Sequence, residues 1–71
     1  MLTKDQYKVL ESLATIKLHN SNRKNLKIKF QTSRYNSNDV QFLIENKLMK
    51  LNMVNEYYLT EDGVRDLKNK Y

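Results

Sequence analysis

A change in the spacing of apolar residues between positions 40 and 66 limits the folds open to this chain. The first apolar residues share one side of a 3.6-residue helix: Val40, Leu43, Ile44 and Leu48. The next ones fall two apart, as in strands with one buried face: Leu51 and Met53, then Tyr57 and Leu59. Residues 54–56 leave room only for a tight turn, which suits Asn55 because asparagine tolerates positive φ. The segment predicts a helix followed by a β-hairpin.

A second helix is predicted directly after this hairpin, near residues 61–70. The hydroxyl of Thr60 can cap its first amides, while Glu61 and Asp62 place negative charge at its positive end. Gly63 is the only glycine of the chain, and it weakens a first turn unless something passes close to its backbone. It therefore predicts tight packing of this helix against the hairpin.

The stretches KLM and YYLTEDG on either side of the turn resemble the corresponding end of winged-helix regulators of the MarR and PadR kind. The resemblance covers residues 40–67, less than half of the chain. It implies a small α+β winged helix, with about three helices and a short antiparallel sheet, in a single domain spanning residues 1–71. Lys47 stands where these families usually place glycine, so we expect the preceding helix to end without a left-handed cap.

Composition excludes several classes of site. Cysteine is absent, so disulfides and thiolate zinc sites are excluded. His19 is the only histidine, and we interpret it as a surface or helix-end residue. The carboxylates are scattered along the chain and not at metal-ligand spacing, so we expect no metal and no cofactor. One glycine cannot form a glycine-rich phosphate loop, and no catalytic constellation is present, so we expect neither an enzyme nor a small-molecule ligand.

No apolar run approaches a membrane span, and the first residues lack the apolar stretch of a signal peptide, so we expect a cytoplasmic protein with no membrane contact. Proline, repeats and low-complexity tracts are absent, which favours one domain. Abundant lysine and asparagine fit an AT-rich genome, such as that of a low-GC bacterium or its phage.

The N-terminus carries a strong helix signal. Thr3 and Gln6 form a capping box, with Leu2 and Tyr7 at the two positions of a hydrophobic staple, which predicts a helix over residues 4–18. Its apolar residues cover about half the circumference, wider than a one-sided stripe: Tyr7, Val9, Leu10, Leu13, Ala14, Ile16 and Leu18. Two explanations remain open, namely packing between two layers of the same chain or a homodimer through the terminal helices.

Positive charge is concentrated in one window. No acidic residue lies between Glu11 and Asp39, where six basic residues occur: Lys17, Arg23, Lys24, Lys27, Lys29 and Arg34. The remaining basic and acidic residues nearly cancel, so the net charge of +5 belongs to this window. Such local charge is typical of a protein that binds a polyanion. The alternatives are an ordinary solvated surface and, more weakly, a membrane surface.

Within this window, Leu26, Ile28 and Phe30 alternate with lysines, which predicts a half-buried strand that joins the hairpin in a small sheet. The other interpretation makes residues 24–34 the second helix of a helix-turn-helix. If the strand forms, residues 31–36 leave space only for a turn or a very short helix before the next helix, so the helix-turn-helix would be degenerate.

The helix from Ser37 to Lys47, capped by Asn36 or Ser37, is the expected recognition helix. Its first residues meet base edges in the major groove, and asparagine and glutamine pair well with adenine. The candidate base readers are therefore Asn36, Ser37, Asn38 and Gln41. The helix carries Asp39 and Glu45 against Lys47, so the phosphate contacts are assigned mainly outside it: Arg23, Lys24, Lys27, Lys29, Arg34 and Lys50.

Five further apolar and aromatic side chains are open to interpretation from the sequence. Phe42 and Met49 lie away from the apolar stripe and are expected either to pack under the basic stretch or to form a protein-binding patch. Tyr35 either covers the core or stacks on a base. Tyr57 and Tyr58 must face opposite sides of their strand.

The turn of the hairpin bears no basic residue, only Asn55 and Glu56 with Asn52 beside it, which argues against insertion into a minor groove. We expect a small winged-helix transcriptional regulator that binds duplex DNA. The alternative is a winged-helix adaptor that binds a protein, for example a phage or mobile-element factor that binds a host protein.

Overall fold

The computed structural model describes residues 2–22 and 27–70. In chain order the elements are α1 (Lys4–Asn22), the 3-10 helix η1 (Thr32–Arg34), α2 (Ser37–Glu45), β1 (Met49–Leu51), β2 (Tyr57–Leu59) and α3 (Glu61–Lys70). The strands β1 and β2 are antiparallel, with Met49 opposite Leu59 and Leu51 opposite Tyr57. Three α-helices and a two-stranded sheet make a small α+β winged-helix-like fold, as predicted.

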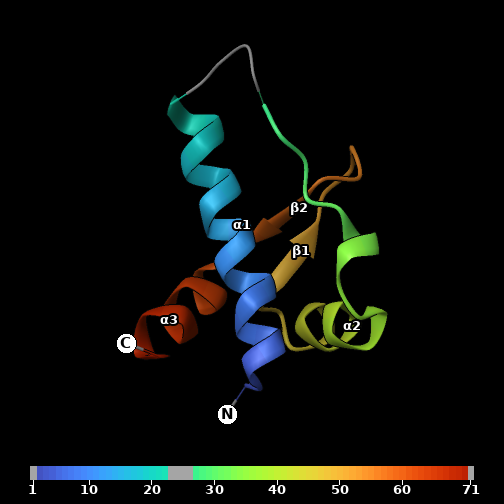
Figure 1. The fold of residues 1–71 in the computed structure, drawn as a ribbon, viewed down its shortest axis with the longest axis vertical. Coiled ribbons are helices and arrows are strands. Elements are labelled where there is room, and N and C mark those ends of the chain that lie inside the picture. Colours follow the sequence, from blue (N-terminus) through green and yellow to red (C-terminus); the bar gives the residue numbers. More distant parts are fainter. Residues whose placement is uncertain (1, 23–26, 71) are drawn as a thin grey trace.

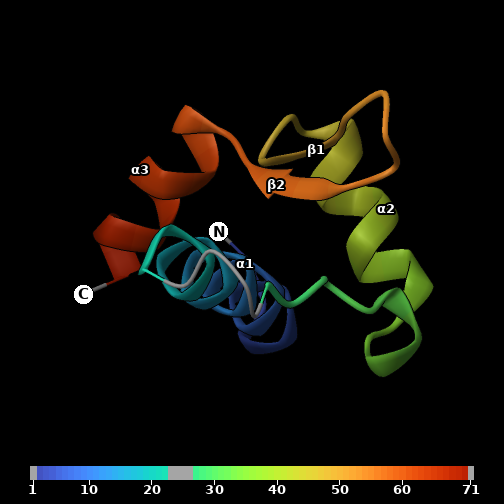
Figure 2. The ribbon, with the colours of Figure 1, turned by 90° about the horizontal axis from the view of Figure 1, so that it is seen from above.

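Helix α1 runs through the middle of the molecule (Figure 1). It contacts α2, α3 and β2, while α2 also contacts β1. Seen from above, the hairpin lies over α1, with α2 and α3 on opposite sides (Figure 2). The broad apolar surface of α1 is thus covered within one chain around Val9, Leu10 and Leu13, as the first explanation requires, whereas Leu18 is 65% exposed. The homodimer through the terminal helices stays a prediction.

The hydrophobic core is small. It is formed by side chains of α1, α2 and β1 and by Leu48, which lies between α2 and β1. Its buried apolar side chains are Val9, Leu10, Leu13, Val40, Leu43, Leu48 and Met49. Met49 belongs to β1 and is fully buried, so the predicted exposed patch of Phe42 and Met49 is wrong. Phe42 stays on α2 with 39% of its surface exposed.

The first helix begins as predicted and ends later. The Thr3 N–H donates to Gln6 Oε1 at 2.9 Å and the Gln6 N–H donates to Thr3 Oγ1 at 3.2 Å, which completes the capping box. The helix then continues to Asn22 rather than stopping at Leu18. Neither glycine nor proline interrupts the four added residues, and among them Asn20 is hydrogen-bonded to Ile28 and Ser21 to the Lys17 carbonyl.

Helix α2 ends at Glu45, two residues before the predicted boundary, and Lys47 follows with a φ of 61°. The expectation of an end without a left-handed residue is therefore wrong. The Lys47 N–H donates to the Ile44 carbonyl at 3.0 Å, and the Leu48 N–H donates to the Leu43 carbonyl at 2.9 Å. These are the two hydrogen bonds of a Schellman motif. Burial of Leu48 offsets the unfavourable conformation of the lysine.

The first strand of the hairpin starts two residues earlier than the apolar spacing predicted, whereas the second strand lies at Tyr57–Leu59 as predicted. Met49 is the buried residue of β1, whereas Leu51 is 46% exposed and Met53 lies beyond the strand, fully in solvent. The predicted buried pair of Leu51 and Met53 is therefore wrong, because pairing begins directly after the buried Leu48. On β2, Tyr57 packs against the core and Tyr58 is exposed, as their alternation required.

The loop of the hairpin is organised by Asn52. Its Oδ1 accepts from the N–H groups of Val54 at 3.0 Å and Glu56 at 2.9 Å. Asn55 adopts a φ of 60°, which confirms the predicted turn role of this residue.

Helix α3 has the predicted bounds and the predicted cap. The Gly63 N–H donates to Thr60 Oγ1 at 3.1 Å, and that hydroxyl donates to the Lys47 carbonyl at 2.6 Å. A Cβ on Gly63 would overlap the Leu48 carbonyl oxygen and lie 2.8 Å from Leu59 Cδ1. The glycine is thus required by the close approach of α3 to the start of the hairpin.

Residues 27–31 form neither of the predicted elements. They run as a stretched, irregular segment, and the sheet in the described part of the chain consists of β1 and β2 alone (Figure 1). The predicted strand is wrong for these residues, and Leu26 lies outside the described ranges. The alternative helix is also wrong for residues 27–34, where η1 alone is helical, and its first residues 24–26 lie outside the described ranges. The main chain of Ile28 bonds to the side chain of Asn20 instead of to a strand.

Candidate nucleic-acid interface

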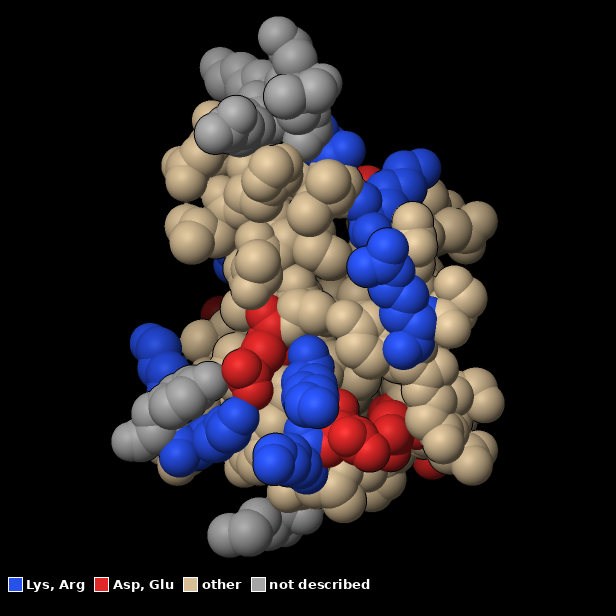
Figure 3. Space-filling view, in the orientation of Figure 1, with Lys and Arg blue, Asp and Glu red and all other residues tan. Residues whose placement is uncertain are grey.

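The basic segment, defined as residues 27–34, lies at the surface with three exposed cationic side chains, Lys27, Lys29 and Arg34. Basic side chains form a row on the side of the molecule where this segment runs, whereas lower down on the same face acidic and basic side chains lie together (Figure 3). Arg23 and Lys24 lie outside the described residues. Three of the six predicted phosphate contacts are therefore found on one continuous stretch.

Two anchors hold this segment against the body of the protein. Phe30 packs against the core, stacks on Tyr35 with ring centroids 5.1 Å apart, and meets the edge of Tyr57 at 5.5 Å. Tyr35 also packs against the core, which agrees with the first of its two predicted roles. The second anchor is Asn20, whose amide bonds both main-chain polar groups of Ile28 at 2.9 Å.

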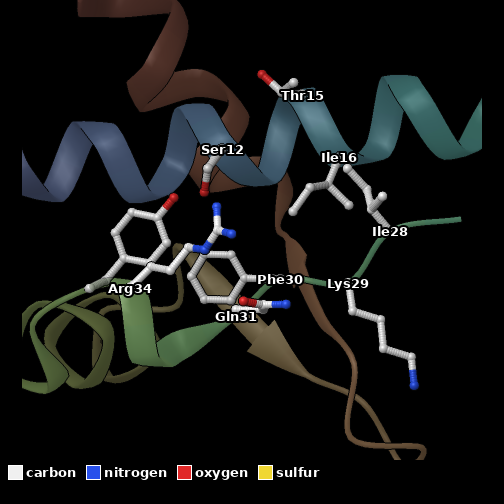
Figure 4. A pocket seen from close by; sticks show the side chains of 9 residues that line it. Ser12, Thr15, Ile16, Ile28, Lys29, Phe30, Gln31 and Arg34 are labelled. Atoms are coloured by element: carbon white, nitrogen blue, oxygen red, sulfur yellow. The ribbon is translucent and has the colours of Figure 1, made fainter.

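The cationic side chains point in different directions. A cavity of about 560 Å³ separates α1 from the basic segment. The Arg34 guanidinium points over this cavity toward Ser12, whereas the Lys29 side chain extends away from α1 (Figure 4). Lys29 is therefore open to solvent, whereas Arg34 lies at the mouth of the cavity.

The four candidate base readers lie at the exposed start of α2, but two of them have side-chain partners. Asn36 is the N-cap, and its Oδ1 accepts from the Asn38 N–H at 2.8 Å. Gln41 Nε2 donates to Glu45 Oε1 at 3.0 Å. The side chains of Ser37 and Asn38 make no hydrogen bond to any residue in the described ranges. Asn38 thus keeps both groups of its amide available for a bidentate contact.

Surface hollows show which candidates lie together. Ser37 and Gln41 line a hollow of about 480 Å³ with the η1 residues Thr32 and Ser33. Arg34 and Asn36 line a second hollow of about 310 Å³. Lys50 is apart from both, because it projects from β1 opposite Tyr58. Among the candidate phosphate contacts, Arg34 therefore lies beside the start of α2, whereas Lys50 lies away from it.

Helix α2 brings no positive charge to this surface. It contains Asp39 and Glu45 but no basic residue, since Lys47 lies beyond its end. Asp39 Oδ1 accepts from Gln6 Nε2 of α1 at 3.5 Å. Attraction of a polyanion to α2 must therefore come from the basic segment that precedes it.

Sequence reasoning missed three features of this surface. Asn20 gave no local signal, because its partner lies eight residues away across a loop. Thr32 and Ser33 share a hollow with the base readers because the segment before α2 is only one turn of 3-10 helix. The exposure of Met53 and Val54 follows from the register of the hairpin.

None of the helices in residues 2–22 and 27–70 combines the length and apolar character needed to cross a membrane. The same ranges contain no cluster of three His, Asp or Glu side chains that could hold a metal ion. Comparisons with protein-family models, curated proteins and solved structures find no match to this chain. The function is therefore inferred from the geometry of its own residues.

Proposed function

We propose that this protein is a small cytoplasmic transcriptional regulator of the winged-helix kind, similar to MarR and PadR regulators, that binds duplex DNA. The observation that carries the proposal is the basic segment: Lys27, Lys29 and Arg34 are all exposed on one stretch of chain, and no acidic residue occurs from Ser12 to Asn38. Exposed positive charge of this kind attracts the phosphate backbone without regard to sequence.

Sequence preference is assigned to the start of α2. Asn38 is the principal reader, because its amide is exposed and neither of its polar groups is hydrogen-bonded to a residue in the described ranges. Gln41 reads a base only after its bond to Glu45 is released. Asn36 contributes mainly by capping the helix, and Ser37 adds a hydroxyl beside it. One bidentate asparagine contact gives about 1–3 kcal/mol of discrimination against the wrong base, which makes specificity modest.

The test is a titration of the intact protein with a mixed-sequence duplex DNA over a range of salt concentrations. Each neutralised phosphate contributes a slope of about −0.9 to the plot of log affinity against log salt. Three contacts from Lys27, Lys29 and Arg34 predict a slope of about −2.7. Absence of binding at low salt contradicts the proposal.

A second function is favoured by one observation, the exposed apolar loop of the hairpin. Met53 is fully exposed and Val54 is 69% exposed, although Asn52 holds the loop in a defined shape. Exposed apolar residues on an ordered surface often mark protein contacts. The adaptor function predicts that Met53→Ser with Val54→Ser abolishes binding to a protein partner and leaves DNA affinity unchanged. Loss of DNA affinity in that variant would instead place the loop on DNA.

A further inference from the structure

We propose that Asn20 is the positioning residue of the basic segment: it fixes the main chain at Ile28 so that Lys27 and Lys29 meet consecutive phosphates of one DNA strand. The inference rests on the proposed DNA-binding function and deepens it. Asn20 lies in the last part of α1 and touches no nucleic acid in this scheme, since it acts through the two lysines.

The hydrogen bonds of Asn20 are those that a neighbouring strand would make. The Ile28 N–H donates to Asn20 Oδ1 at 2.9 Å, and Asn20 Nδ2 donates to the Ile28 carbonyl at 2.9 Å. An asparagine amide has one donor group and one acceptor group side by side, as a peptide edge has. Within the described ranges, no other hydrogen bond holds the main chain of residues 27–30. Asn20 therefore sets both the place and the rotation of this stretch.

That rotation determines where the lysines point. The side chain of Ile28 faces Ile16 on α1, whereas Lys29 extends away from the helix (Figure 4). Lys27 and Lys29 are the exposed residues on either side of Ile28, so the rotation of the main chain at Ile28 sets the direction of both side chains. They lie about 7 Å apart along the chain, which resembles the spacing of consecutive phosphates on one strand. The contact is therefore with the backbone of DNA, independent of base sequence.

Holding the segment before DNA arrives lowers the cost of binding. A loose segment loses conformational entropy when it is ordered on a partner, and this loss reduces affinity. With Asn20 in place, part of that loss has already occurred on folding. Removal of the amide should weaken binding although neither lysine has been changed.

The experiment is a double-mutant cycle on the full chain with a mixed-sequence duplex DNA as probe. Asn20→Ala is made in the natural sequence and in a chain in which Lys27 and Lys29 are both glutamine. We expect about a tenfold loss of affinity in the natural background, the equivalent of one to two net hydrogen bonds. We expect almost no further loss in the glutamine background, because the groups that Asn20 positions are then neutral.

Ser21→Ala is the matched control. Ser21 is the next residue of α1 and is exposed, and its hydroxyl donates to the Lys17 carbonyl at 2.8 Å rather than to the basic segment. This variant should keep the DNA affinity of the natural protein. Hydrogen exchange gives a second readout: the Ile28 amide should lose protection in Asn20→Ala and keep it in Ser21→Ala.

Three outcomes decide between the possibilities. An equal loss from Asn20→Ala in both backgrounds overturns the inference, because Asn20 would then act on the fold and not through the lysines. An unchanged affinity in Asn20→Ala, with weaker binding by the glutamine variant, overturns the inference and supports the proposed function. Failure of the natural protein to bind DNA at low salt overturns the proposed function itself and the inference with it.

Discussion

Replacement of Lys47 by glycine should stabilise the protein, because this lysine has a φ of 61° at the end of α2. The left-handed conformation costs an ordinary residue about 1–2 kcal/mol, a penalty that glycine avoids. Glycine loses about 0.5–1 kcal/mol in return, since it is freer in the unfolded chain. The difference predicts that Lys47→Gly raises the free energy of unfolding by about 0.5–1 kcal/mol.

The assay is urea unfolding of Lys47→Gly beside Asn46→Gly, a control one residue earlier. Asn46 has a φ of −91°, and its Nδ2 donates to the Phe42 carbonyl at 2.8 Å, so glycine there should destabilise the protein. With an m value of about 1 kcal/mol/M, the urea midpoint of Lys47→Gly should rise by about 0.5–1 M. A midpoint that falls in both variants refutes the left-handed Schellman end of α2.

Three further substitutions have expected outcomes. Gly63→Ala should lower the free energy of unfolding by about 1–3 kcal/mol, despite the helix preference of alanine, because the new Cβ overlaps the Leu48 carbonyl; an unchanged urea midpoint contradicts this. Glu45→Gln should raise affinity for duplex DNA at low salt, since it removes a negative charge from α2; weaker binding argues against α2 facing DNA. Asn38→Ala should change the sequences selected from a random duplex pool and hardly alter affinity for mixed DNA; selection of the same sequences removes Asn38 as a reader.

The elements that the sequence predicted well are those set by neighbouring residues. The capping box of Thr3 and Gln6, the Asn36 cap and the Thr60 cap are all formed, because each joins a side chain to an amide within three residues. Gly63 was informative for a different reason. A glycine in the first turn lowers the stability of a helix, so its presence there indicated a close contact from outside the helix. The structure shows that this contact is the Leu48 carbonyl.

The errors lie where distant residues decide between equal local patterns. Apolar residues two apart fitted strands at Leu51 and Met53 as well as at Met49 and Leu51. The burial of Leu48 and Met49 selects the earlier register. Lys47 adopts a conformation that its own side chain disfavours, because the same burial compensates for it. Neither outcome is visible in the spacing alone.

The sequence predicted the charged residues of the candidate site but not the contacts that position them. Charge is read directly from the sequence, so exposed Lys27, Lys29 and Arg34 were expected and are found at the surface. Alternation around Ile28 suggested a strand, but a strand also needs a partner. Asn20 supplies the hydrogen bonds in place of one, and no local pattern links two residues eight positions apart.

The decisive measurement is the salt dependence of DNA binding by the natural protein and by the variant with glutamine at both Lys27 and Lys29. In the proposed interface, the exposed lysines of the basic segment neutralise phosphates. If so, the log-log slope should become less steep by about 1.8 in the variant, which is two phosphates at about 0.9 each. Equal slopes and equal affinities for the two proteins would contradict the claim.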